Sequence, residues 1–305
     1  MSRILHFHYD WVSLDDKQFP RIVREFLDNG ADHFVITEDL LLQMIENPER
    51  KDFLHKICKD MNVHFSTVHA LFGPKWDLNI PNPADREKML RHQKKGMQIS
   101  REFGCVTYTI HVGAYHYCYD RIPLETLRPL AHQALETLIP EAEKLGMIIA
   151  VENSFEMPNS AKEVIGLTDP FMSSPAIGLC YDTGHANCMA SAPWKKMEEY
   201  APYFPVCWWE NGVIPEDGAL EKMKDRIVTC HIHDNNGYAD LHDMPGDGTI
   251  DWNALVPELK SCPNIKEYQT EVGLVGGRNW AGVSAAPAGG YSIRRLVDTF
   301  RKLGF

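Results

Sequence analysis

Eight short β-rich segments alternate with longer helical segments along the whole chain, and the first of them is ILHFHY, near the start. The segments between them have the spacing of amphipathic helices. We expect helices over residues 15–28, 40–60, 83–103, 124–145, 161–167, 194–200, 252–260 and 292–303. Strands joined by helical crossovers run parallel. The pattern therefore predicts an α/β fold, a (β/α)8 TIM barrel, with residues 1–305 as a single domain.

Composition restricts the classes of partner. The 305 residues carry 31 basic and 42 acidic side chains, a formal net charge of -11, which disfavours nucleic acid and anionic membranes. No apolar run approaches the length of a membrane span. The eight cysteines contain no C-x-x-C pair, which is typical of reduced thiols in a chain of this size. We expect a cytoplasmic protein with no nucleic-acid or membrane partner, and the sequence leaves open whether it forms a homo-oligomer.

Four of the β-rich segments end on a residue that can bind a metal ion: Glu152, Asp182, His231 and Glu271. In a parallel barrel these ends meet at one rim, where barrel enzymes build their sites. A charge at the end of a buried strand is costly unless a cation or partner neutralises it. Three carboxylates and one imidazole predict one divalent metal ion, and the sequence does not distinguish Mn, Mg, Co and Zn.

Strand alternation directs further side chains to this rim. His69 shares a strand face with Thr67, and His111 shares one with Thr109. Weaker candidates for the site are Glu38, Glu156, Cys180 and Cys230. The long segments that follow the strands contain residues expected to cover a substrate, contact a neighbouring subunit or bind a phosphate: Trp208, Trp209, Trp280 and Arg278.

Short motifs around these residues resemble the xylose isomerase-like TIM-barrel superfamily over nearly the whole chain. They are VHA at 68–70, IHVG at 110–113, VEN at 151–153, DTGH at 182–185, HIHD at 231–234, PGDGTIDW at 245–252 and TEVG at 270–273. The superfamily contains sugar isomerases and epimerases, hydroxypyruvate isomerases, inosose dehydratases and apurinic endonucleases. The resemblance implies a metal-dependent isomerase or epimerase of carbohydrate metabolism that acts on a small sugar, sugar acid or sugar phosphate.

The resemblance also assigns roles to residues. It makes Glu152, Asp182, His231 and Glu271 the metal ligands, with His231 preferred to His233 because the family's ligand stands three residues before the acid. Glu152 and Glu271 become the acid/base pair that moves a proton through an enediolate. The expected substrate-binding residues are His69, His111, His185 and His242.

Other interpretations remain open. Ketose 3-epimerases that resemble this chain have a glutamate and an arginine where Pro158 and Gly237 stand, which indicates that a free ketohexose is not handled in their manner. A trinuclear-zinc phosphodiesterase, similar to apurinic endonucleases, would use further ligands present here: His69, His111, His185, Asp240 and His242. The charge of -11 and the lack of a basic stripe disfavour it. An inosose-type dehydratase would use the same site, and a non-catalytic sugar-binding barrel would not need the metal.

Overall fold

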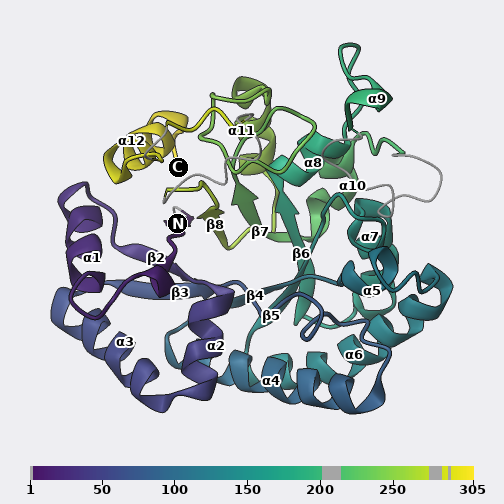
Figure 1. Ribbon diagram of the computed structural model, residues 1–305, viewed down its shortest axis with the longest axis horizontal. Coiled ribbons are helices and arrows are strands. Elements are labelled where there is room, and N and C mark those ends of the chain that lie inside the picture. Colours follow the sequence, from purple (N-terminus) through teal and green to yellow (C-terminus); the bar gives the residue numbers. More distant parts are fainter. Residues whose placement is uncertain (1–2, 201–213, 275–283, 288–289) are drawn as a thin grey trace.

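Eight parallel strands occupy the centre of the computed structural model, which describes residues 3–200, 214–274, 284–287 and 290–305 (Figure 1). The strands are β1 (Ile4–His6), β2 (His33–Ile36), β3 (His64–Val68), β4 (Thr107–Ile110), β5 (Ile148–Glu152), β6 (Ile177–Asp182), β7 (Ile227–Ile232) and β8 (Glu267–Thr270). All eight predicted strands form, and the chain has the predicted TIM-barrel fold.

Hydrogen-bonded ladders connect most of the barrel. Six strands form one sheet in the order β1-β8-β7-β6-β5-β4, and β2 pairs with β3. Two isolated parallel bridges, Phe7 with Phe34 and His69 with Thr109, link the two sheets on either side. Every strand therefore has a neighbour on both sides, and the carboxyl ends of the strands face the same rim.

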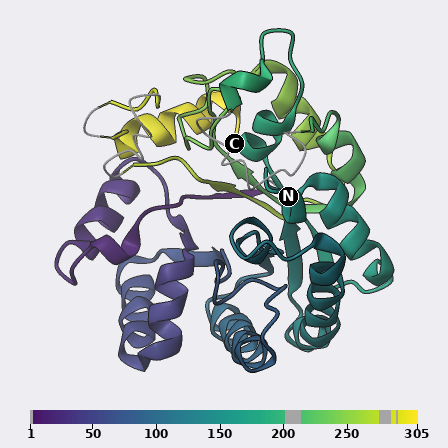
Figure 2. The ribbon, with the colours of Figure 1, turned by 45° about the vertical axis from the view of Figure 1, so that its right-hand side comes forward.

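Helices surround the strands in both views of the ribbon (Figures 1 and 2). They are α1 (Phe19–Asp28), α2 (Glu38–Glu46), α3 (Pro48–Met61), α4 (Pro83–Glu102), α5 (Tyr115–Cys118), α6 (Leu124–Leu145), α7 (Ala161–Thr168), α8 (Thr183–Met189), α9 (Met197–Tyr200), α10 (Ala219–Met223), α11 (Trp252–Ser261) and α12 (Ile293–Leu303). Within the described residues, no helix is both long and apolar enough to cross a lipid bilayer.

The expected single helix over residues 40–60 is wrong, because the chain forms α2 and α3 there. Asn47 separates them with extended backbone, at φ -132° and ψ 104°. The ring of the following Pro48 disfavours helical backbone at Asn47 and fits the first turn of a new helix. The Asn47 side chain then accepts a hydrogen bond from the Glu49 amide and caps α3.

Two other helices are shorter than expected. The segment 15–28 becomes helical only at Phe19, because the Asp15 carboxylate accepts hydrogen bonds from the amides of Lys17 and Gln18 and holds a turn. In the segment 194–200 only α9 is helical.

Buried polar residues gather inside the barrel, whereas the space between strands and helices is apolar. Outside the strands an aromatic cluster centres on the buried Trp11, with the rings of Phe19 and Phe34 at 4.9 and 5.3 Å. Inside, Thr107 and Glu267 are the first residues of β4 and β8. Thr67, on β3, and Thr107 both donate hydrogen bonds to the same oxygen of Glu267. Burial raises the pKa of Glu267 to about 7, against the lowering effect of the two threonines. We call these three residues the floor layer.

Candidate metal centre and active site

Strand geometry brings the four predicted ligands to one rim. Glu152 and Asp182 are the last residues of β5 and β6, His231 lies in β7, and Glu271 follows β8. Asp182 pairs in register with His231, so the two side chains leave the sheet at the same level. Side-chain exposure is 1% for Glu152, 0% for Asp182 and His231, and 12% for Glu271. We call these four residues the rim layer.

His231 lies at the meeting point of this layer. Its Nδ1 atom is 3.1 Å from Glu152 Oε1 and 3.1 Å from Glu271 Oε1. Although these distances are short, three buried atoms have no hydrogen-bond partner among the described residues. They are Glu152 Oε1 and the two ring nitrogens of His231. Ligands about 2.1 Å from one ion, at right angles, stand about 3 Å apart. The donor set and its spacing therefore fit a divalent cation better than a network of direct hydrogen bonds.

Asp182 is held by a residue that sequence reasoning set aside. Its carboxylate is 3.9 Å from His231 Nδ1, whereas His233 Nε2 lies 3.1 and 3.0 Å from its two oxygens. The backbone amide of His185 also donates to Asp182, at 2.6 Å. Gly184 allows this approach, since a Cβ atom there would stand 2.0 Å from the His233 ring. His231 thus faces both glutamates, and His233 positions the aspartate.

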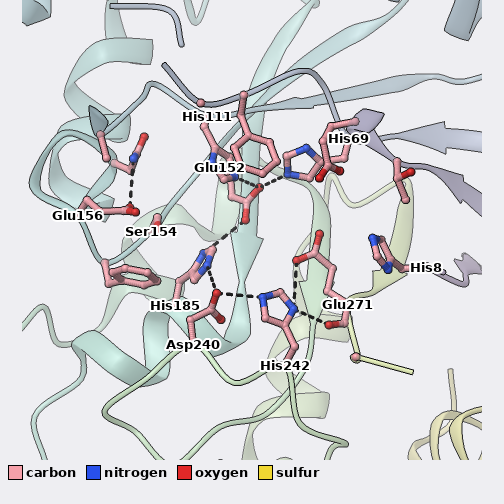
Figure 3. Close-up of a pocket in the computed structure, with 18 of the residues that line it drawn as sticks. His8, His69, His111, Glu152, Ser154, Glu156, His185, Asp240, His242 and Glu271 are labelled. Atoms are coloured by element: carbon pink, nitrogen blue, oxygen red, sulfur yellow. Dashed lines mark hydrogen bonds and ion pairs between the residues drawn. The ribbon is translucent and has the colours of Figure 1, made fainter. Parts of the chain in front are cut away.

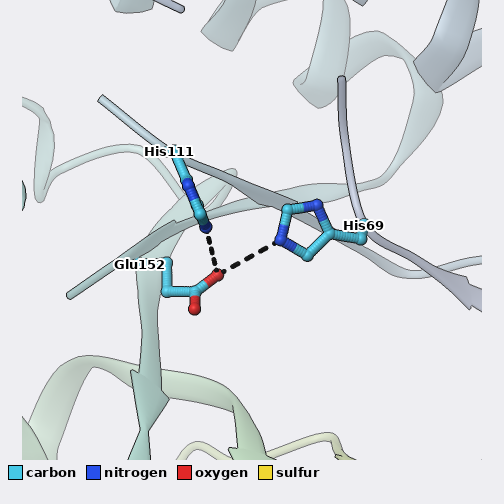
Figure 4. A group of neighbouring side chains, drawn as sticks. All are labelled: His69, His111 and Glu152. Atoms are coloured by element: carbon cyan, nitrogen blue, oxygen red, sulfur yellow. Dashed lines mark hydrogen bonds and ion pairs between the residues drawn. The ribbon is translucent and has the colours of Figure 1, made fainter. Parts of the chain in front are cut away.

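His69 and His111 converge on the other oxygen of Glu152 (Figure 4). Their Nε2 atoms lie 3.5 and 3.0 Å from Glu152 Oε2. Burial raises the pKa of Glu152, but the imidazoles of His231 and His111 outweigh it and leave this pKa well below its usual range. Burial lowers the pKa of His69, and Glu152 reverses this to about 10. Imidazole nitrogens therefore lie near both oxygens of Glu152, but among the described residues only Oε2 has a hydrogen bond, with His111.

A second group of donors surrounds Asp240, which lies in the segment between β7 and α11 (Figure 3). His242 Nε2 and His185 Nε2 lie 2.9 and 3.6 Å from Asp240 Oδ2. Burial raises the pKa of Asp240, but these two imidazoles lower it well below its usual range. His185 also approaches Glu152 Oε1, at 3.4 Å, so this group adjoins the rim layer.

A cavity of about 580 Å³ opens over these groups. Figure 3 shows Glu156 and Ser154 at one end of it and His8 at the other, with Glu152, Asp240 and Glu271 between them. The four histidines predicted to bind substrate line it: His69, His111, His185 and His242. The weaker candidates Glu38 and Glu156 also line it. Its volume is in the range of small-molecule sites.

Other weak candidates have different outcomes. Cys180 lies near Glu152 and His231, but burial first, and the charge of Glu152 second, raise the pKa of its thiol well above the usual value. At neutral pH it therefore remains a neutral thiol. The predictions for Trp208, Trp209, Arg278 and Trp280 lie outside the described residues.

Some lining residues were missed by sequence reasoning. His8 lines the cavity, and its alternation with His6 in the β-rich segment ILHFHY was a usable signal. Asp77, Phe72, Tyr115 and Tyr119 also line it, but they lie in loops or in a short helix, where no periodic pattern predicts a direction.

Comparison with known proteins places the chain in a family. The family model described as "Xylose isomerase-like TIM barrel" matches residues 23–263, and the chain belongs to this family. One relative, the uncharacterized protein MJ1311 of Methanocaldococcus jannaschii, is 29% identical over 63% of this chain. The chain spans 59% of that relative's length and 21% of a second relative's length.

Solved structures share the fold at low identity. The apo form of YcjR from E. coli, a 3-keto-D-glucoside 4-epimerase, has a TM-score of 0.67 and 17% identity, and the match covers 99% of each chain. The TTHB071 protein from Thermus thermophilus, studied after soaking with ZnCl2, has a TM-score of 0.58 and 22% identity, over 88% of this chain and 91% of that one.

Proposed function

We propose that this protein is a divalent-metal-dependent isomerase or epimerase that acts on a sugar, sugar acid or sugar phosphate by proton transfer through an enediolate. The observation that carries the proposal is the convergence of Glu152, His231 and Glu271, at 3.1 Å on each side of one imidazole nitrogen, without hydrogen bonds between them. Asp182 would complete the ligand set. The similarity to a sugar epimerase supports the proposal at the level of the fold.

A divalent ion held by these four residues would supply Lewis-acid polarisation of a substrate carbonyl. The protein's own part is proton transfer and positioning. Glu152 and Glu271 approach His231 Nδ1 from two different strands, so a substrate bound at the rim lies within reach of two carboxylates. One removes the proton from the carbon beside the carbonyl, and the other returns a proton to the neighbouring carbon or to the opposite face.

The surrounding imidazoles would bind the substrate's hydroxyl groups. His69, His111, His185 and His242 line the cavity. The first two lie beside Glu152, and the other two lie beside Asp240. A polyhydroxylated ligand needs such donors and acceptors around a buried site. This assignment gives the four histidines a role without further metal ions.

Solvent exchange tests the proposal directly. Ketoses, aldoses, inososes, their phosphates and glycosides that carry a ring ketone are incubated with the protein in deuterated water with Mn²⁺. The proposal predicts deuterium at a carbon next to the carbonyl of at least one compound, and loss of this exchange in Glu271→Gln. Failure of every compound to exchange, with the metal bound, would contradict it. Loss of a β-hydroxyl from the substrate would identify a dehydratase working through the same first step.

A second candidate function has a specific observation in its favour. His69 and His111 meet on Glu152, and His185 and His242 meet on Asp240. These two donor groups match the further ligands of a trinuclear-zinc phosphodiesterase. Metal analysis separates the candidates, because the isomerase needs one ion per chain and the hydrolase three. Cleavage of an abasic oligonucleotide would favour the hydrolase.

A further inference from the structure

Part of the cavity, which we call the arm, is lined by residues that the proposed proton transfer does not use. The loops after β3 and β4 supply Phe72, Asp77, Tyr115 and Tyr119 to its lining, and the loop after β5 supplies Glu156. Glu156 lies at the end of the cavity remote from His8 (Figure 3). A single sugar ring held between Glu152 and Glu271 would leave this arm to be filled by something else.

Aromatic exposure is concentrated on this arm. Four large aromatic side chains are exposed in the described part of the chain, and three of them, Phe72, Tyr115 and Tyr119, line the cavity, with exposures of 39%, 37% and 58%. The Phe72 ring lies 5.2 and 5.0 Å from the rings of His69 and His111, so it borders the histidine pair beside Glu152. Exposed apolar surface gathered at one pocket is typical of a binding site.

The tyrosine pair is held in place by its helix. Tyr115 begins α5 and Tyr119 follows its last residue, so both side chains lie on one helix face, with ring centroids 5.0 Å apart. Tyr117 and Cys118 are buried and pack the rest of α5 into the protein. The two exposed rings are therefore presented by a fixed element.

Polar groups accompany these rings. Asp77 is 3% exposed, accepts a hydrogen bond from the Gly73 amide at 2.7 Å and packs against Gly113, where a Cβ atom would stand 2.2 Å from its own. Burial raises the pKa of Asp77 to about 8, which favours the protonated form of its side chain. The Glu156 side chain accepts a hydrogen bond from the Asn159 side-chain amide at 3.3 Å. These two side chains offer hydrogen-bonding oxygens to a ligand in the cavity.

We propose that this arm binds a second ring of the substrate, so that the substrates are sugars joined to another ring, as in a disaccharide or an aryl glycoside. The inference rests on the proposed function. A glycosidic bond prevents the first ring from opening to its anomeric carbonyl, so the carbonyl beside which the proton moves is a ketone on a ring carbon. The flat faces of Tyr115 and Tyr119 pack against the apolar face of the second ring, and Asp77 and Glu156 bind its hydroxyl groups.

Binding measurements test this subsite on the whole protein. Calorimetric titrations compare methyl glycosides of glucose and galactose with the corresponding 4-nitrophenyl glycosides and with cellobiose and lactose. The expected result is about tenfold tighter binding of the two-ring compounds of at least one series. Tyr119→Ala should remove most of this preference. Tyr119→Phe, which keeps the ring, and Trp194→Ala, which removes an exposed aromatic outside the cavity, should retain it.

Three outcomes would overturn the inference. They are equal binding of one-ring and two-ring compounds, binding of none of them, and equal weakening of both classes by Tyr119→Ala. A change of oligomeric state in Tyr119→Ala, seen by sedimentation velocity, would instead assign the rings to a contact between copies of the chain. Because binding is measured separately from deuterium exchange, a ring preference without exchange would reject the proposed function and keep the subsite. Deuterium exchange without a preference for two-ring compounds would keep the proposed function and reject the subsite.

Discussion

The floor layer and the rim layer are both polar and both buried inside the same barrel, yet they differ in how their charges are satisfied. In the floor layer, the hydroxyl groups of Thr67 and Thr107 serve one oxygen of Glu267, and burial favours its protonated form. In the rim layer, Glu152 Oε1 and both nitrogens of His231 have no hydrogen-bond partner among the described residues. A buried layer whose polar atoms hydrogen-bond to one another stabilises a core. A buried layer whose polar atoms lack partners requires a ligand.

The largest effect should come from replacing a glutamate by glutamine in each of the two layers. Glu271→Gln removes a proton acceptor and a metal ligand, and we expect deuterium exchange to fall by about 10²- to 10⁴-fold. Glu267→Gln, four residues earlier on the same strand face, should retain the exchange rate. Rates are compared by NMR with an active substrate at saturating Mn²⁺. Equal loss in both variants would show that the layers do not differ in function.

Metal removal should act on the rim layer alone. We expect a chelator to lower the thermal midpoint, and an ion present at about 100 to 1,000 times its dissociation constant to restore about 3 to 4 kcal/mol of stability. The response should disappear in His231→Ala and persist in Glu267→Gln. Differential scanning fluorimetry with and without EDTA makes the measurement. A full response in His231→Ala would place the stabilising ion elsewhere.

The floor layer should control a pH dependence of stability. The pKa of Glu267 is raised from 4.5 to about 7, so the folded state keeps a proton that the unfolded state loses as pH rises above 4.5. Wild-type stability should therefore fall between pH 4.5 and 7, and the full loss of about 3 kcal/mol should remain above that range. Glu267→Gln, which cannot ionise, should lack this component. Urea unfolding across this pH range measures the difference, and parallel curves for the two proteins would refute the assignment.

The smallest effect should follow loss of one floor donor. Thr67→Val removes a hydroxyl that donates to Glu267, and we expect a loss of about 1 kcal/mol in unfolding free energy. Thr137→Val, on the outer helix α6, is the matched control and should change stability less. Metal affinity should be the same in both variants, and a weakened metal site in Thr67→Val would mean that the two layers are coupled.

The sequence was most informative where a periodic element ends. Alternation along strands placed Glu152, Asp182 and His231 at one rim, and the structure brings them together. The break between α2 and α3 was also readable, because Pro48 follows Asn47. By contrast, the direction of Tyr115 depends on how α5 packs, and the contact of His233 with Asp182 depends on space left by Gly184. Such positions follow from tertiary packing, which local patterns do not specify.

The most direct test of the account is the metal content of the purified protein. The protein is prepared without chelator, supplied with Mn²⁺ or Zn²⁺, dialysed and analysed by inductively coupled plasma mass spectrometry, together with Glu267→Gln and His231→Ala. The account predicts about one tightly held divalent ion per chain in the wild type and in Glu267→Gln, and little in His231→Ala. A wild-type chain that retains no ion, or a His231→Ala variant that retains as much, would contradict it.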